Sequence, residues 1–295
     1  MRKFLIRFLK PLKKYYYQFS FDWQKRDSLN QQLQVQILNQ YRILKQQNNL
    51  PPLNETGFRV YSQFEEDGLL LYIFSVIGFR SKKVVEMCCG GGIECMATNL
   101  IINHGFEGFL FDGNPANVAN ANAFFKSKQD CLLFSPRIQN AWITKENVNA
   151  LLNNIGASGE VDLFSLDIDG NDYWIWEAIE AIQPRVCIFE TQNVIPSDLS
   201  ITIPYSPDFY CWDKKGYEQD FRSVSLLAMT NLSKKKGYRL IGAHRHGFNA
   251  IYMRNDIGLQ EFPEVTVESV HQNHWTKYCQ STIWPQVKHM GWENV

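Results

Sequence analysis

The sequence predicts an α/β fold, in which a mostly parallel sheet is covered by helices on both faces and closed by an antiparallel pair of strands. Two observations favour this class. Apolar, β-branched runs alternate with helical patterns between residues 69 and 236, and each run ends in a polar turn, as the strands of a buried parallel sheet do. Residues 238–243 and 249–253 then form two strand patterns joined by a short turn.

The N-terminal part of the chain predicts helices only. Residues 28–47 carry apolar side chains at helical spacing in a glutamine-rich background, and Pro51 with Pro52 ends the pattern. A second, more apolar helix is expected at 69–77. The sheet is therefore expected to follow a helical extension.

Strands and helices then alternate. A β-branched run predicts the first strand at 83–87, three glycines allow a sharp turn at 90–92, and helical spacing predicts a helix at 93–104. The same two patterns predict the later elements in chain order: a strand at 108–111, a strand at 131–134, a helix at 145–154, a strand at 161–166, a helix at 173–182, a strand at 185–189 and a helix at 223–236.

Composition limits the class of protein. The chain has 295 residues, of which 45% are hydrophobic, which is enough to bury one large core. We expect a basic amphipathic N-terminal helical extension at 1–55, one catalytic domain at 56–256 and a tryptophan-rich C-terminal extension at 257–295. Thirty basic and thirty acidic residues cancel, so no global charge favours a nucleic-acid partner. Seven cysteines, mostly within apolar runs, indicate a reducing compartment such as the cytoplasm.

The first residues form a basic amphipathic pattern. No apolar stretch approaches the roughly 20 residues that a membrane-spanning helix needs. Phe4, Leu5 and Phe8 follow helical spacing among lysines and arginines, while Pro11 would break the helix. Two interpretations stay open: peripheral contact with the inner face of an anionic membrane, and packing on this protein or on a partner.

The strand at 83–87 and the glycine turn predict a nucleoside-cofactor site. Asp112 closes the next strand about 20 residues after the glycines, where a carboxylate can accept hydrogen bonds from ribose hydroxyls. This spacing serves both NAD and S-adenosylmethionine. Glu86 at the end of the first strand, and Glu94 in the first turn of the expected helix, would repel a pyrophosphate, whereas Glu86 suits the ammonium and sulfonium charges of S-adenosylmethionine.

Four successive strands are expected to end in a carboxylate. Glu86, Asp112, Asp167 and Glu190 hold these positions. Because ligands of open α/β sheets bind beyond the carboxyl ends of the strands, we expect the four side chains to contribute to one site.

Taken together, these motifs resemble the class I S-adenosylmethionine-dependent methyltransferases, and among them the FkbM-like family. The resemblance covers roughly residues 58–256. It is carried by five segments of the sequence: Ser62-Gln63 with Glu66-Asp67-Gly68, Val85-Glu86 with the glycine turn, Leu110-Phe111-Asp112-Gly113-Asn114, Leu166 to Asp172, and Asn249 to Arg254. It implies a Rossmann-like class I methyltransferase sheet. Cys88 and Cys89 depart from the family pattern, in which small residues are typical.

The resemblance also implies roles for particular residues. Glu86 and the backbone of Gly90, Gly91 and Gly92 would hold the methionine part of S-adenosylmethionine, with Gln63 at its amino-acid end. Asp112 with Gly113 would hold the ribose. Asn114 would contact the adenosine edge, and Ala141 or Trp142 would lie beside the adenine. Packing of Trp142 in the core is the alternative.

Methyl transfer to a hydroxyl needs a base near the acceptor. Asp167 is the first candidate for a carboxylate that faces the cofactor, and Asp169 for contact with the acceptor or its proton. His246 is a second candidate base, with a polar turn as its alternative. A further alternative is a Mg²⁺ ion held by Asp167 or Asp169 together with Glu190 or Asn193.

The acceptor side is expected to be aromatic. Residues 203–213 form a proline-rich aromatic segment, in which Tyr205 and Trp212 can stack on a sugar ring while Asp208 bonds its hydroxyls; Asn249 is a further candidate. We therefore expect an O-methyltransferase for a saccharide or surface-glycan precursor, with a homodimer as one option for its assembly. The alternatives are an NAD(P)-dependent oxidoreductase and a noncatalytic binding protein on the same fold.

Overall fold

The computed structural model describes residues 30–295, and these divide between two compact units, Met1–Asn49 and Leu50–Val295. The described part of the first unit is a helix over residues 30–46, as the helical spacing at 28–47 predicts. The basic amphipathic pattern at the start of the chain lies outside the described residues. Within residues 30–295 no helix is long and apolar enough to cross a membrane.

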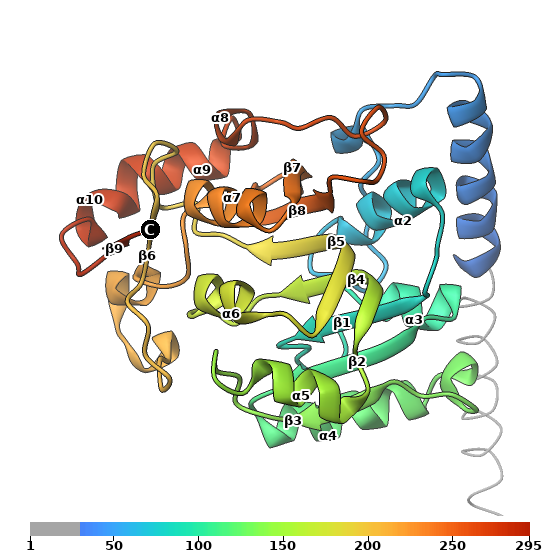
Figure 1. Ribbon diagram of the computed structural model, residues 1–295, viewed down its shortest axis with the longest axis horizontal. Helices are drawn as coiled ribbons and strands as arrows, with labels where there is room; N and C mark the ends of the chain where they lie inside the picture. The colour runs from blue at the N-terminus through green and yellow to red at the C-terminus, as the bar shows by residue number, and fades with distance from the viewer. Residues whose placement is uncertain (1–29) are drawn as a thin grey trace, which may run out of the picture. The chain divides into compact units, whose positions relative to one another are not determined.

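The second unit is built on a seven-stranded sheet, which confirms the α/β prediction (Figure 1). In spatial order its strands are β3 (Arg137–Asn140), β2 (Glu107–Asp112), β1 (Lys83–Met87), β4 (Gly159–Leu166), β5 (Ile182–Glu190), β8 (Asn249–Arg254) and β7 (Tyr238–Ala243). The first five pair in parallel, and β8 pairs antiparallel with both β5 and β7. The closing antiparallel pair is therefore confirmed, and it separates this sheet from the doubly wound dinucleotide-binding order.

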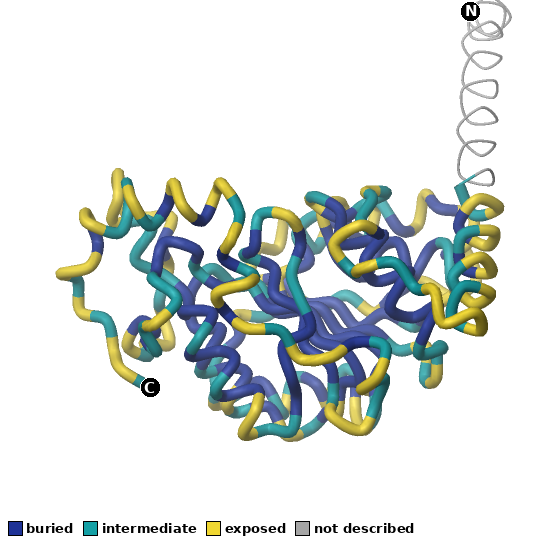
Figure 2. Tube along the Cα trace, turned by 90° about the horizontal axis from the view of Figure 1, so that it is seen from above, coloured by how far each residue is buried: buried dark blue, intermediate teal, exposed yellow. Residues whose placement is uncertain are grey.

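Helices cover both faces of this sheet. On one face, side chains of β1, β4 and β5 pack with three helices in a single large apolar cluster; these helices are α5 (Val148–Ile155), α6 (Asp172–Ala178) and α7 (Leu226–Lys235). The other face carries the helices that precede and follow β1 and β2, which are α2 (Glu66–Ile77), α3 (Thr98–His104) and α4 (Pro115–Lys126). The strands between the layers are buried along most of their length (Figure 2).

The C-terminal segment contains three short α-helices and one strand of a second, two-stranded sheet. Its helices are α8 (Val267–Val270), α9 (His274–Tyr278) and α10 (Trp284–Val287), and its last strand, β9 (Glu293–Asn294), pairs with β6 (Ile201–Thr202). Val194, Cys279 and Val287 form the small core of this region.

One predicted strand is wrong. Cys131 ends a short 3₁₀ turn that begins at Gln129, residues 132–134 follow it as a loop, and the third strand is Arg137–Asn140. The apolar run of Leu132, Leu133 and Phe134 is solvent-exposed, Leu133 completely so. An apolar run alone does not distinguish a buried strand from an exposed loop tip, because periodicity says nothing of burial.

The helix expected at 93–104 begins five residues late, at Thr98. The carboxylate of Glu86 accepts hydrogen bonds from the backbone N–H groups of Met96 and Ala97, at 2.9 and 2.7 Å, and so holds this segment as a loop. Glu94 is exposed, has φ of 66° and is not in a helical turn. The argument that Glu94 repels a pyrophosphate at a helix N-terminus is therefore wrong.

Candidate functional site

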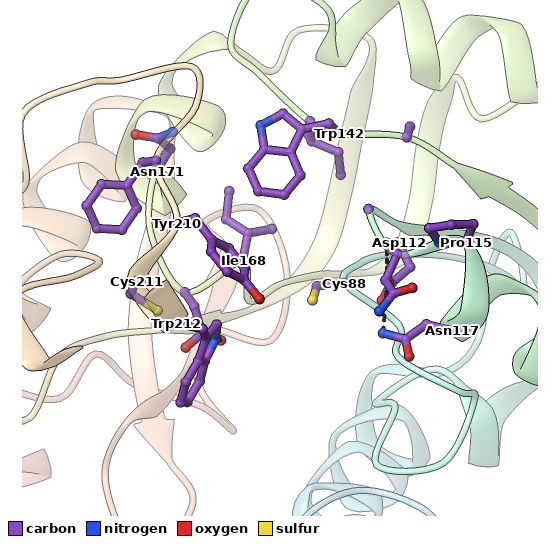
Figure 3. Close-up of a pocket in the computed structure, with 16 residues that line it drawn as sticks. Cys88, Asp112, Pro115, Asn117, Trp142, Ile168, Asn171, Tyr210, Cys211 and Trp212 are labelled. Atoms are coloured by element: carbon purple, nitrogen blue, oxygen red, sulfur yellow. Dashed lines mark hydrogen bonds between the residues drawn. The ribbon is translucent and has the colours of Figure 1, made fainter. Parts of the chain in front are cut away.

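A cavity of about 550 Å³ opens beyond the carboxyl ends of β1, β2 and β4. Its size suits a nucleoside-sized ligand. Figure 3 shows Asp112 and Asn117 on one side of it, Tyr210 and Trp212 on the other, and Cys88 between them. The remaining lining comes from the loops after β2, β3 and β4 and from the segment after β6: Gly113, Asn114, Pro115, Ala141, Trp142, Ile143, Ile168, Asp169, Asn171, Phe209 and Cys211.

Asp112 is fixed at the end of β2. Its Oδ2 accepts a hydrogen bond from the backbone N–H of Gly90 at 2.9 Å, and its Oδ1 accepts one from the N–H of Asn114 at 2.8 Å and one from the side-chain amide of Asn117 at 3.1 Å. A carboxylate offers about four acceptor positions. Asp112 therefore joins the glycine turn to the start of α4 and retains acceptor capacity beside the cavity.

The side chain of Glu86, on β1, points into the loop that precedes α3. The backbone N–H groups of Met96 and Ala97 and the thiol of Cys95 all donate to its carboxylate. Burial raises the pKa of Glu86 to about 7, because desolvation outweighs these three hydrogen bonds. Glu86 is only 4% exposed and is not among the described residues that line the cavity.

Among the described residues between β1 and α3, the cavity is lined by Cys88 and not by Gly90 to Gly92. Cys88 has φ of 73°, a left-handed conformation that costs a side-chain-bearing residue free energy, and it lines the cavity. Gly92 has φ of 83°, and a Cβ there would come within 3.0 Å of the Phe124 ring, so glycine is required. Gln63, the other predicted contact of the amino-acid end, is exposed.

Aromatic side chains from the loop after β3 and the segment after β6 close the cavity. Trp142 is 48% exposed, which excludes packing in the core, and its indole N–H donates to the carbonyl of Pro207 at 2.7 Å. The rings of Trp142 and Tyr210 lie 6.2 Å apart. Trp142 also lies 3.0 Å from the position of a Cβ on Gly113, so this glycine allows the indole to approach the loop after β2.

Three carboxylates converge at the ends of β4 and β5. Oxygens of Asp167, Asp169 and Glu190 all lie within 4.8 Å of one another. Burial, followed by the charge of Asp169, raises the pKa of Asp167 to about 7, and burial with the charge of Asp167 raises the pKa of Glu190 well above its usual range. We call Asp167, Asp169 and Glu190 the acidic cluster.

Arginine is the cation of this cluster. The guanidinium Nη1 of Arg222 lies 3.2 Å from Asp169 Oδ1, and the indole N–H of Trp212 donates to Asp169 Oδ2 at 3.0 Å. The carboxylate spacing itself fits a divalent ion. The charge does not fit, because Arg222 already occupies Asp169, so we derive no step through a metal. Asn193 directs its amide N–H groups to the carbonyl of His246 and to Thr276.

Several predicted site residues lie away from the cavity. His246 packs against Phe64, with ring centroids 4.8 Å apart. Asn249 donates to the buried carboxylate of Glu66 at 2.8 Å. The Tyr205 hydroxyl bonds Glu146 on the surface. Among the described residues, none of these three lines the cavity, and neither does Asp208.

Sequence reasoning missed Arg222, Asn117, Asn171 and Tyr210. Asn117 lies three residues after Asn114, one helical turn into α4, and could have been found from the helical period. Asn171 donates to the carbonyl of Ser206 at 2.7 Å, so it fastens the aromatic segment to the loop after β4. No sequence motif marks Arg222. Only the fold of the chain brings it beside the end of β5.

No family model matches the chain, and no curated protein does. Solved structures with a similar chain path include an S-adenosylmethionine-dependent methyltransferase from Clostridium acetobutylicum (12% identity, 61% of this chain and 87% of that one, TM-score 0.38). Another is the N-terminal domain of EvdMO1 with SAH and D-fucose (11% identity, 74% and 93%, TM-score 0.40). A third is the methyltransferase domain of bacterial CtHen1 (12% identity, 63% and 94%, TM-score 0.39). The similarity concerns the path of the chain alone.

Proposed function

We propose that this protein is an S-adenosylmethionine-dependent O-methyltransferase. The observation that carries the proposal is the cavity at the ends of β1, β2 and β4, in which the buried carboxylate of Asp112 faces an exposed indole, Trp142. The acceptor position that Asp112 retains can take a ribose hydroxyl, and an aromatic ring can stack on adenine. The antiparallel position of β8, which the dinucleotide-binding order lacks, favours this cofactor over NAD.

The cofactor roles follow from position along the cavity. Asp112 with Gly113 would hold the ribose, and Trp142 with Ala141 the adenine. Asn114 caps α4 by accepting from the N–H of Ala116, so it would support the adenosine edge from the helix start. The methionine part would extend from Cys88 toward Gly90 to Gly92, with Gln63 at its exposed end, and Glu86 would act on it only through the 95–97 loop that its carboxylate holds.

The acidic cluster is the proposed catalytic end of the cavity. In an in-line displacement, an acceptor hydroxyl oxygen forms a bond to the methyl carbon while the carbon–sulfur bond breaks and its electron pair returns to sulfur. The hydroxyl proton must pass to a base. Asp169 lines the cavity and would contact the acceptor, and the Asp167–Glu190 pair beside it would receive the proton. His246 could take this role only if an acceptor extended beyond the cavity.

The acceptor class is inferred from the wall opposite Asp112. Tyr210 and Trp212 are about half exposed, which leaves ring faces available for a sugar, and Asp169 and Asn171 are polar neighbours for its hydroxyls. We propose a saccharide or glycan precursor as acceptor, with a cytoplasmic location or peripheral attachment at the inner membrane face. Tyr205, Asp208 and Asn249 would contact only the outer part of a longer acceptor.

Calorimetric titration with S-adenosylhomocysteine and with NAD tests the cofactor. We expect micromolar binding of S-adenosylhomocysteine, at least tenfold weakened by Asp112→Ala, and weaker or no binding of NAD. The matched control is Asp208→Ala, which removes an exposed carboxylate outside the cavity and should leave the affinity unchanged. Preference for NAD would overturn the proposal in favour of an oxidoreductase. Tight S-adenosylhomocysteine binding without turnover on any glycan would favour a noncatalytic binding protein.

A further inference from the structure

We infer that Arg222 is the resident cation of the acidic cluster and that its guanidinium excludes a divalent metal ion, so that the site works without one. This inference deepens the proposed function, on which its catalytic meaning rests. Its structural content rests on the contacts of Arg222 alone.

Both oxygens of Asp169 are engaged by protein donors. Arg222 Nη1 lies 3.2 Å from Oδ1, and the indole N–H of Trp212 lies 3.0 Å from Oδ2. The guanidinium also lies over the Trp212 ring, 5.1 Å from its centroid. A metal ion at Asp169 would have to share both oxygens with a charged donor and an indole that support each other.

The backbone directly after Arg222 is fixed to the core. The carbonyl of Ser223 accepts hydrogen bonds from the N–H of Ile203 at 3.2 Å and from the hydroxyl of Thr202 at 3.0 Å. The N–H of Gln192, directly after β5, donates to the carbonyl of Val224 at 2.7 Å. Arg222 is therefore held against the end of the strand that carries Glu190.

The charges of the cluster favour this arrangement. The carboxylate of Asp169 attracts the guanidinium, as does that of Glu190 when it is ionised, and an arginine side chain keeps its charge at any pH at which the protein is folded. A divalent ion placed among the three carboxylates would lie next to this positive charge and be repelled by it. The side chain of Arg222 is only 18% exposed, so solvent screens the repulsion weakly.

Without the guanidinium, the same carboxylates form a metal site. Their oxygens lie within 4.8 Å of one another, a spacing that metal–oxygen distances of about 2.1 to 2.4 Å permit. Replacing Arg222 by a neutral side chain should therefore convert a site that excludes metal into one that binds it.

Binding of Mn²⁺, followed by electron paramagnetic resonance, tests the inference on the full-length protein. We expect no stoichiometric Mn²⁺ site in the wild type and one site in Arg222→Gln. The affinity of Arg222→Gln for Mn²⁺ should be at least tenfold higher than any residual affinity of the wild type. Adding Asp169→Asn to Arg222→Gln should abolish the gain. Arg222→Lys, which keeps the charge, should behave as the wild type does. Lys234→Gln removes one positive charge from an exposed ion pair on α7 and should bind no metal.

Two results would overturn the inference: a stoichiometric Mn²⁺ site in the wild type that Asp169→Asn abolishes, or no gain of binding in a folded Arg222→Gln. The wild-type result decides the matter even if the variant does not fold. S-adenosylhomocysteine calorimetry on the same samples separates the two proposals. Loss of cofactor binding in every sample, with the expected Mn²⁺ pattern, would refute the methyltransferase proposal and leave the role of Arg222 intact.

Discussion

The stability of the protein is expected to depend on pH through Glu86. This residue is 4% exposed, and desolvation raises the pKa of its carboxyl group to about 7 from 4.5. Between these two values the folded state binds more protons than the unfolded state, so stability contributed by Glu86 is present at low pH and is lost as pH rises through about 7. Each pKa unit corresponds to about 1.4 kcal/mol, so the contribution changes by about 2 to 3 kcal/mol between pH 5 and pH 8.

Urea unfolding of the wild type and Glu86→Gln at both pH values isolates this effect. The variant keeps one oxygen to accept from Met96 or Ala97 but cannot ionise. Other groups titrate in the same range, including half-buried His104, whose pKa is lowered to about 4 by desolvation, but they contribute equally to both proteins. The wild type should lose about 2 to 3 kcal/mol relative to the variant on going from pH 5 to pH 8. A pH-independent difference would refute the reasoning.

Three further substitutions test the core, the turn and the cavity. Asp162→Ala removes the partner of buried Arg185, at 2.6 Å, and should lower the free energy of unfolding by about 3 to 5 kcal/mol in urea titrations; a loss under 1 kcal/mol would contradict this. Cys88→Val should destabilise by about 1 to 3 kcal/mol, because a β-branched residue does not tolerate φ of 73°, whereas Cys88→Gly should not; equal stabilities would refute the strain argument. Trp142→Ala should weaken S-adenosylhomocysteine about tenfold in calorimetry and Trp142→Phe much less, and unchanged affinity would rule out stacking on Trp142.

The strands near the site could be predicted because their local patterns agree with their environment. β1, β2 and β4 are short apolar runs, and each is followed by a polar turn. The positions of Asp112, Asp167 and Glu190 follow from strand ends alone, since parallel strands bring their carboxyl ends to one edge of the sheet, but Glu86, which the same argument placed with them, bonds its own loop instead.

The rest of the site depends on contacts distant in sequence. Nothing in the sequence of residues 93–97 indicates that the carboxylate of Glu86 accepts hydrogen bonds from the N–H groups of Met96 and Ala97, so that α3 begins only at Thr98. Arg222 and Asp169 are 53 positions apart and meet only because Ser223 is fixed beside β5. Such pairings have no local periodicity, so a single sequence does not reveal them.

A crystal structure with S-adenosylhomocysteine bound tests the central proposal most directly. We predict adenine against the ring of Trp142, a ribose hydroxyl on the carboxylate of Asp112, and the sulfur atom directed toward Asp169. A ligand bound elsewhere, or a cavity that stays empty at saturating S-adenosylhomocysteine, would contradict the proposed function.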